Sequence, residues 1–307
     1  MNEGTLTLKN SEKIELIGSL ATMLSAGIPI LEVVNSLLED SRGSQKKILE
    51  TLKDDLMQGN HVYITFSKFP RVFDKVTVSV VKASEEAGTL DITLKDLKQT
   101  IQKEVEFSDK VKSALVYPVF IVIVFLGVLF MILVVVVPKI TTVFSRLNVA
   151  LPLPTRILIF LSTLLIEQTI SVGAAGVLLV GGILFLYKKK RVVLQEFVYS
   201  FPLISHLVEE IDITRFSRSL HLLLASGLPI TSALELATDV VTKRKTARII
   251  ARSREMVFAG KRLSEGFRAA RGYIPTIMIK LMEAGEKTGT LDKSMQDISE
   301  YFDYQVT

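Results

Sequence analysis

The chain has 307 residues, a net charge of +5 and no cysteine, and 49% of its residues are hydrophobic. This length has room for about two domains, and a mean hydropathy of +0.39 suits a protein with both membrane segments and soluble parts. The lack of cysteine excludes disulfides and thiolate metal sites. We expect no N-terminal signal peptide, because Glu3, Glu12 and Glu15 stand where it would need a basic region and an apolar core.

The chain begins with a series of short helices. Apolar residues at helical spacing start at Ile14 and stop before Gly27 and Pro29, and a second helix then continues to Leu38. We expect Gly27 to have a positive φ just past the first helix, because glycine pays no steric penalty in that conformation. Pro29 fits the first turn of the next helix.

Three further helices follow before the apolar part of the chain. Ile48–Met57 is a short helix, and Phe73–Ala83 has apolar residues on helical faces, although its valines would also suit a strand. The segment Glu85–Leu90 is typical of the end of one helix and the start of another. The charged helix Leu94–Lys112 then runs directly into an apolar segment.

The apolar segment Val119–Val137 has nineteen residues without a charge, an amide or a hydroxyl. At a rise of 1.5 Å per residue it covers about 28 Å, the thickness of the hydrocarbon core of a bilayer. The alternative is a buried core helix, but few soluble helices are apolar on every face for five turns. We expect Pro138 to end this span and residues 138–156 to form a short exposed connection.

A second apolar stretch, Ile157–Tyr187, is interrupted at Glu167. It is too long for one straight span, so we expect Ile170–Tyr187 to cross the membrane. Ile157–Ile166 would lie at the interface or pack against the first span. Four glycines in the second span would allow close helix approach in lipid: Gly173, Gly176, Gly181 and Gly182.

Basic residues predict the orientation. Lys103, Lys110 and Lys112 precede the first span, and the run Lys188–Arg191 follows the second. Because basic residues near span ends favour the cytoplasm, both large soluble parts should be cytoplasmic and the 138–156 loop external. Neither soluble part is basic enough to argue for nucleic acid as a partner.

The two soluble parts form an internal repeat. Ser19–Ile30 matches Ser219–Ile230 at an offset of 200, and Glu85–Asp91 matches Glu286–Asp292 at an offset of 201. The matched residues are mostly apolar residues or residues of structural turns. These turn residues are Gly27, Pro29, Gly88, Gly227, Pro229, Gly285 and Gly289. We therefore predict an all-α, polytopic membrane protein with homologous helical-bundle domains at 1–113 and 188–307, joined by a transmembrane hairpin at 114–187.

These motifs together resemble the inner-membrane platform proteins of type II secretion systems and type IV pili. The Leu-x-x-Gly-hydrophobic-Pro turn occurs at Leu24–Pro29 and at Leu224–Pro229. The Gly-Glu-x-x-Gly-x-Leu turn is intact at Gly285–Leu291, whereas Ser84 replaces its first glycine in the first repeat. Two further segments resemble the family's approaches to its first and second spans: Lys112–Pro118 and Leu151–Thr155.

The resemblance implies a non-enzymatic scaffold, without cofactor, in the inner (cytoplasmic) membrane of a bacterium. It implies that the protein couples a cytoplasmic assembly ATPase to pilin or pseudopilin subunits, contacts other inner-membrane assembly proteins and forms a homo-oligomer. Family members usually carry a third span after the second domain. We therefore expect the native sequence to continue past Thr307 with another apolar run.

The residues themselves give no sign of catalysis. His61, His206 and His221 lack metal-ligand spacing, and neither a phosphate-binding loop nor a Gly-x-Ser-x-Gly elbow occurs. A small-molecule transporter is the alternative function, but it needs a polar cavity at mid-membrane, and Glu167 is the one ionisable residue of the apolar runs. An intramembrane protease would need a catalytic pair, which is absent from the sequence.

Two groups of charged residues are candidate partner contacts. Glu85, Glu86 and Glu286 recur at the same turn of both repeats, and they either form a solvated turn or contact a basic surface or a divalent ion. The second group is a basic cluster, either a solvated helix face or a surface that attracts anionic lipid or an acidic partner. Its members are Lys243, Arg244, Lys245 and Arg248, followed by Arg252 and Arg254.

Overall fold

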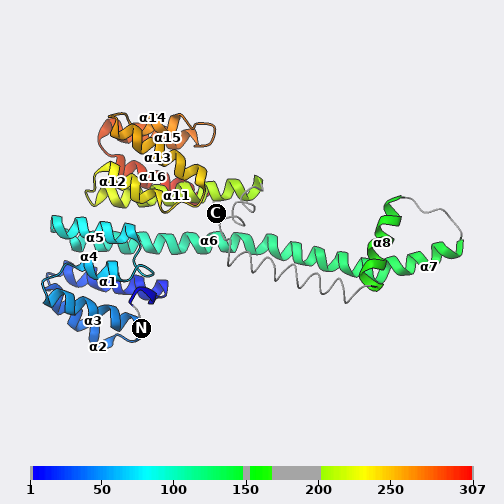
Figure 1. Ribbon diagram of the computed structural model, residues 1–307, viewed down its shortest axis with the longest axis horizontal. Helices are drawn as coiled ribbons and strands as arrows, with labels where there is room; N and C mark the ends of the chain where they lie inside the picture. The colour runs from blue at the N-terminus through cyan, green and yellow to red at the C-terminus, as the bar shows by residue number, and fades with distance from the viewer. Residues whose placement is uncertain (1–2, 148–152, 168–201, 306–307) are drawn as a thin grey trace. The chain divides into compact units, whose positions relative to one another are not determined.

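The computed structural model describes residues 3–147, 153–167 and 202–305, and every regular element in these ranges is a helix (Figure 1). The chain divides into two compact units. The first contains Met1–Lys110 and His206–Thr307, and the second contains Val111–Ser205. The first unit thus contains the described helices of both sequence repeats.

The first repeat contains six helices, the last of which continues into the second unit. After a 3-10 turn, η1 (Glu3–Thr5), they are α1 (Asn10–Ser25), α2 (Ile30–Asp40), α3 (Gly43–Met57), α4 (Val62–Lys68), α5 (Lys75–Ala87) and α6 (Leu90–Met131). The valine-rich segment at residues 73–83 is helical, so the strand alternative is wrong.

The second repeat has the same six helices in the same order. They are α11 (Pro202–Ala225), α12 (Ile230–Thr238), α13 (Arg244–Phe258), α14 (Leu263–Arg268), α15 (Thr276–Thr288) and α16 (Leu291–Gln305). The sequence did not predict α4 and α14, which have only seven and six residues.

The predicted turns are confirmed. Gly27 and Gly227 follow α1 and α11 with φ of +80° and +85°, a conformation that costs a residue with a Cβ about 1–2 kcal/mol. Pro29 and Pro229 stand immediately before α2 and α12, one residue earlier than predicted.

The buried side chains follow the same correspondence. Leu20 and Phe66 are fully buried in the first repeat, and Leu220 and Phe267 occupy the matching places in the second. The helix order, the glycine conformations and the core therefore all support the repeat that the sequence predicted.

In the second unit, the apolar helix is continuous with α6. Residues 90–144 form the one helix in the described ranges that is long and apolar enough to cross a membrane (Figure 1). Its apolar side chains are mostly exposed, for example 60% for Phe120 and 64% for Phe125. A core helix would bury such side chains, so the exposure favours a lipid-facing segment.

The helix continues through Pro138, where the sequence predicted the end of the span and the start of an exposed connection. A π turn, η2 (Ile132–Val136), is followed by α7 (Val137–Leu147), which contains Pro138 and occupies much of the predicted exposed connection. In the π turn, the Val137 amide donates to the Ile132 carbonyl. The next donor in that register is Pro138, which has no N–H to offer the Leu133 carbonyl.

A serine from another helix supplies the missing hydrogen bond. Helix α8 (Leu153–Glu167) packs against η2 and α7, and its buried Ser162 hydroxyl donates to the Leu133 carbonyl oxygen at 2.6 Å. The proline therefore stays inside the helix because a neighbouring side chain satisfies the freed carbonyl. The contact supports the packed alternative for Ile157–Ile166, and the predicted second span, Ile170–Tyr187, lies outside the described residues.

Candidate functional site

The two recurring glutamates cap helices within their own repeats. Glu85 on α5 accepts hydrogen bonds from the Val62 and Tyr63 amides at 2.7 and 3.0 Å. These amides belong to the first turn of α4, where backbone N–H groups lack partners inside the helix. The Glu85 side chain is only 11% exposed, so this carboxylate is largely engaged inside the repeat.

Glu286 makes the same contact in the second repeat. It accepts from the Leu263 amide at 2.5 Å and from the Ser264 amide at 3.3 Å, and the Ser264 hydroxyl also donates to it. The recurrence of this acid in both repeats therefore has a structural explanation, because each copy caps the short helix α4 or α14. Glu86 differs, since it is 63% exposed and lies 4.0 Å from Lys82 on the same helix.

A third cap was not predicted from the sequence. The buried Asp212 on α11 accepts from the Thr242 and Lys243 amides at 2.7 and 2.8 Å, at the N-terminus of α13. Burial raises the pKa of this carboxyl above its usual value, and the two backbone hydrogen bonds act in the opposite direction.

The basic cluster lies at the start of α13. Arg244, Lys245 and Arg248 are exposed, as is Arg252 one turn further along the helix. Lys243 is different, because it lies 3.7 Å from Glu209 and 5.6 Å from the Tyr273 ring centroid. The structure therefore brings the arginines together on an exposed face and turns Lys243 inward.

The structure does not gather the acidic turns into a metal site. Across residues 3–147, 153–167 and 202–305, no group of three or more His, Asp or Glu side chains is placed to hold a metal ion. His221 contacts the Asp292 carbonyl oxygen at 2.8 Å, whereas His61 and His206 lie beside Glu85 and Glu210.

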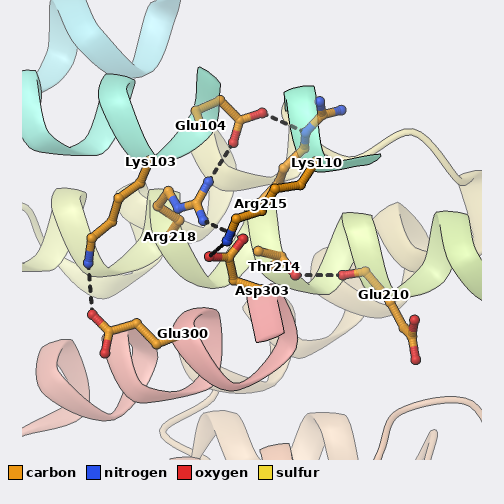
Figure 2. A network of polar contacts seen from close by, with 9 residues as sticks. All are labelled: Lys103, Glu104, Lys110, Glu210, Thr214, Arg215, Arg218, Glu300 and Asp303. Carbon is orange, nitrogen blue, oxygen red and sulfur yellow. Dashed lines mark hydrogen bonds and ion pairs between the residues drawn. The ribbon is translucent and has the colours of Figure 1, made fainter. Parts of the chain in front are cut away.

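A network of charged side chains joins the two repeats (Figure 2). Glu104 on α6 accepts from Arg215 and Arg218 on α11, both at 2.8 Å. Lys103 donates to Glu300 at 2.8 Å, and Lys110 lies 3.6 Å from Asp303 on α16. These contacts could not be predicted from the sequence, because the partners are more than 100 residues apart in the chain.

A cavity of about 910 Å³ lies beside this network and is lined by both repeats. Lys13, Phe73 and Leu97 come from the first repeat, and Arg215 and Leu222 come from the second. Burial lowers the pKa of the Lys13 ammonium, although the charge of Asp74 opposes the shift. Charged groups around a hollow thus contribute to the junction, and the buried hydrophobic core also includes residues of both repeats.

The comparisons with known proteins agree with the repeat and the helices. The family model for type II secretion system protein F matches residues 16–138 and 216–306. The type IV pilus assembly protein PilC of Myxococcus xanthus is 28% identical over 93% of this chain and 69% of its own length. PilC of Thermus thermophilus is 29% identical, over 94% of this chain and 71% of its own length.

A secretion protein is as similar as the pilus proteins. Type II secretion system protein F of Pseudomonas aeruginosa is 29% identical over 90% of this chain and 69% of its own length. The family model covers more than half of the chain, and its two matches fall on the two helical repeats. The chain therefore belongs to the type II secretion system protein F family.

Proposed function

We propose that this protein is the inner-membrane platform of a type II secretion or type IV pilus assembly machine. It is a non-enzymatic, multi-pass homo-oligomer that couples a cytoplasmic assembly ATPase to pilin or pseudopilin subunits and contacts other inner-membrane assembly proteins. The family membership supports the platform role. The observation that carries the coupling is the continuity of α6, which begins in a helical repeat and becomes the apolar segment.

A continuous helix can transmit a tilt or rotation along its axis, because its backbone hydrogen bonds resist bending. The chain has no phosphate-binding Gly-x-x-x-x-Gly-Lys-Ser/Thr motif, so we infer that a partner supplies the energy. An assembly ATPase in the cytoplasm would provide it if the repeats face that side of the membrane.

The test is co-purification of the full chain with the assembly ATPase from detergent-solubilised membranes of the native host, together with deletion of the gene. Deletion should abolish secretion or pilus assembly, and the ATPase should be recovered with the tagged chain. Reconstitution of the chain in vesicles tests the alternative function, a small-molecule transporter. Uptake of a small solute without any loss of assembly on deletion would contradict the platform role.

We further propose the exposed basic face of α13 as a contact for an acidic partner surface or for anionic lipid. Helix α13 contains five Lys or Arg residues and one acid, whereas its counterpart α3 contains three of each sign. Because the two helices occupy matching places in the repeat, the fold alone does not require the excess positive charge on α13.

The basic face is tested by reversing Arg244 and Arg248 to Glu. Secretion or pilus assembly should fall at least tenfold while the amount of membrane-inserted protein is unchanged. Lys46→Glu with Lys53→Glu on α3 is the matched control and should have little effect. An equal loss of assembly in both double variants, or loss of the protein itself, would show that the cluster is an ordinary solvated face.

The acidic turns are tested in the same assay. We propose that Glu86, the exposed acid of the turn, contacts the partner, and that Glu85 and Glu286 support this contact by fixing the turns. Glu86→Lys should reduce assembly without changing the thermal unfolding midpoint, whereas Glu85→Gln and Glu286→Gln should lower that midpoint because they weaken helix caps. Full assembly with Glu86→Lys would exclude Glu86 as a contact.

A further inference from the structure

A groove of about 360 Å³ lies between α1 and α6 on the first repeat. Among the described residues that line it, every polar side chain can donate a hydrogen bond and none is acidic. The lining residues are Gly18, Ala21, Thr22 and Ser25 of α1 with Lys95, Lys98, Gln99 and Gln102 of α6. The α1–α6 groove therefore carries two positive charges and no negative one.

The two lysines of the groove are not neutralised by the protein. Lys95 and Lys98 lie one helical turn apart on α6, so both side chains lie on the same face. Among the residues that the structure describes, neither lysine has an ion-pair or hydrogen-bond partner. The Lys98 stem lies against Gly18, where an added Cβ would be 2.9 Å from its Cδ and Cε. This contact keeps the Lys98 ammonium beside the groove.

The second repeat contains the matching groove, and there it is occupied. Three of its residues, Arg218, Glu300 and Asp303, contact α6 of the first repeat (Figure 2). At the repeat offsets of 200 and 201, they match Gly18, Gln99 and Gln102 of the α1–α6 groove.

The occupant of the matching groove is one face of a helix. Glu104 and Lys103 of α6 make hydrogen bonds of 2.8 Å with it, and Lys110 lies 3.6 Å from its acid. Phe107, which lies between these charged residues on α6, is buried. The fold therefore uses this groove once to hold a helix with an aromatic side chain between charged ones.

We propose that the α1–α6 groove of the first repeat binds an acidic helix of a partner protein. Two glutamines replace the acids of the matching groove, and Lys95 and Lys98 replace the uncharged Gln296 and Ser299, so the preferred charge of the occupant is reversed. Asp or Glu residues one turn apart on a helix can reach both lysines. The groove is argued without the proposed platform function, and only a partner within the assembly machine rests on that function.

A charge-reversed copy of the helix that occupies the matching groove is the probe. It is a fluorescent peptide with the sequence of residues 96–113 and the changes Lys103→Glu and Lys110→Glu, and its control is the unchanged sequence. Fluorescence anisotropy is measured with the full chain in nanodiscs of neutral lipid. The reversed peptide should bind about tenfold or more tightly than the control, because only the reversed peptide complements the lysines.

Variants of the chain locate the bound peptide. Lys95→Glu with Lys98→Glu should weaken binding of the reversed peptide about tenfold or more. Lys95→Gln with Lys98→Met should weaken it in the same direction, and this variant keeps an apolar stem against Gly18. Failure of the reversed peptide to bind, or equal binding to the native chain and both variants, would overturn the proposal.

Two control variants separate the groove from the net charge of the chain. They make the same reversals on other helices: Lys46→Glu with Lys53→Glu on α3, and Arg244→Glu with Arg248→Glu on α13. Both should bind the reversed peptide as the native chain does. Binding that depends on the α13 pair and not on the groove lysines would also overturn the proposal.

Crosslinking in the native host identifies the natural occupant. A photoreactive residue at exposed Gln99 should crosslink to an acidic helix of another protein, and the same residue at exposed Glu50 on α3 should not. Crosslinks only to lipid or to a second copy of this chain would contradict the proposal. Secretion or pilus assembly is measured separately in Lys95→Glu with Lys98→Glu, so a failed platform role would not be mistaken for a failed groove.

Discussion

Gly285 and Ser84 occupy the same place in the two repeats but have different neighbours. A Cβ at Gly285 would lie 2.4 Å from Ser294 Oγ and 3.0 Å from Leu291 Cα, so α15 and α16 approach each other closely. Ser84 is fully buried, and its hydroxyl donates to the Val81 carbonyl oxygen at 2.9 Å. Ser84 stands where the turn motif of the family has a glycine, and the first repeat accommodates this serine.

We predict that Gly285→Ala destabilises the protein by about 1–3 kcal/mol, because overpacking forces neighbouring atoms apart. Thermal unfolding of the full chain in detergent measures the loss. Ser84→Ala is the matched control and should cost about 1 kcal/mol or less, since it removes one hydrogen bond and no volume is added. An unchanged unfolding midpoint for Gly285→Ala would show that α16 can move aside.

Asp212 predicts a dependence of stability on pH. Burial raises its pKa in the folded state above its usual value, so at a pH between the unfolded pKa and the folded pKa the folded protein binds more protons than the unfolded chain. The contribution of this group is therefore fully present below the unfolded pKa and is lost as pH rises through the folded pKa. The unfolding midpoints of the native chain and Asp212→Asn, compared at several pH values, test this sign. The difference should shift in favour of the native chain on acidification toward pH 3.8.

At the scale of elements, Pro138 and Ser162 show how a local rule is overridden. Proline inside a helix removes a donor, and the sequence therefore predicted that the span ends at Pro138. The donor that replaces it comes from α8, 29 residues away from Leu133, and nothing in the local pattern indicates it. We predict that Ser162→Ala loosens α8 from the π turn at a cost of about 1–3 kcal/mol, the penalty for an unpaired buried carbonyl.

Hydrogen exchange of α8 amides in the full chain measures this loosening. Thr163→Ala is the matched control, because the Thr163 hydroxyl donates to Ile159 of its own helix and is exposed. Exchange in α8 should accelerate in Ser162→Ala and remain unchanged in Thr163→Ala. Equal exchange in both variants would show that another group satisfies the Leu133 carbonyl.

The difference between local preferences and contacts from distant residues decides which elements could be predicted from the sequence. Gly27, Gly227 and their following prolines carry their own conformational preference, so the turns and the repeat were predicted correctly. Helices α4 and α14 are too short for their apolar residues to show a clear helical spacing. Their caps come from Glu85 and Glu286, which lie more than 20 residues away in the chain. The contacts of Arg218 with Glu104 depend on how whole helices pack, which the spacing of residues along the chain does not show.

At the scale of the whole molecule, the orientation in the membrane is a prediction from charge alone. Basic residues precede the apolar part of α6, and Lys188–Arg191 follow the second apolar stretch. Helix α7 adds Lys139 and Arg146 to the region between the apolar stretches, so that region is not free of positive charge. The balance still favours cytoplasmic repeats, because four consecutive basic residues outweigh separated ones near a span.

Reporter fusions to the full chain decide the orientation. A reporter active only in the cytoplasm, fused after Arg191, should be active, and the same reporter inserted within 148–151 should be silent. A reporter active only outside the cytoplasm should give the reverse pattern at both sites. The opposite result would place both repeats outside, away from ATP. It would also remove the basis for coupling to a cytoplasmic ATPase.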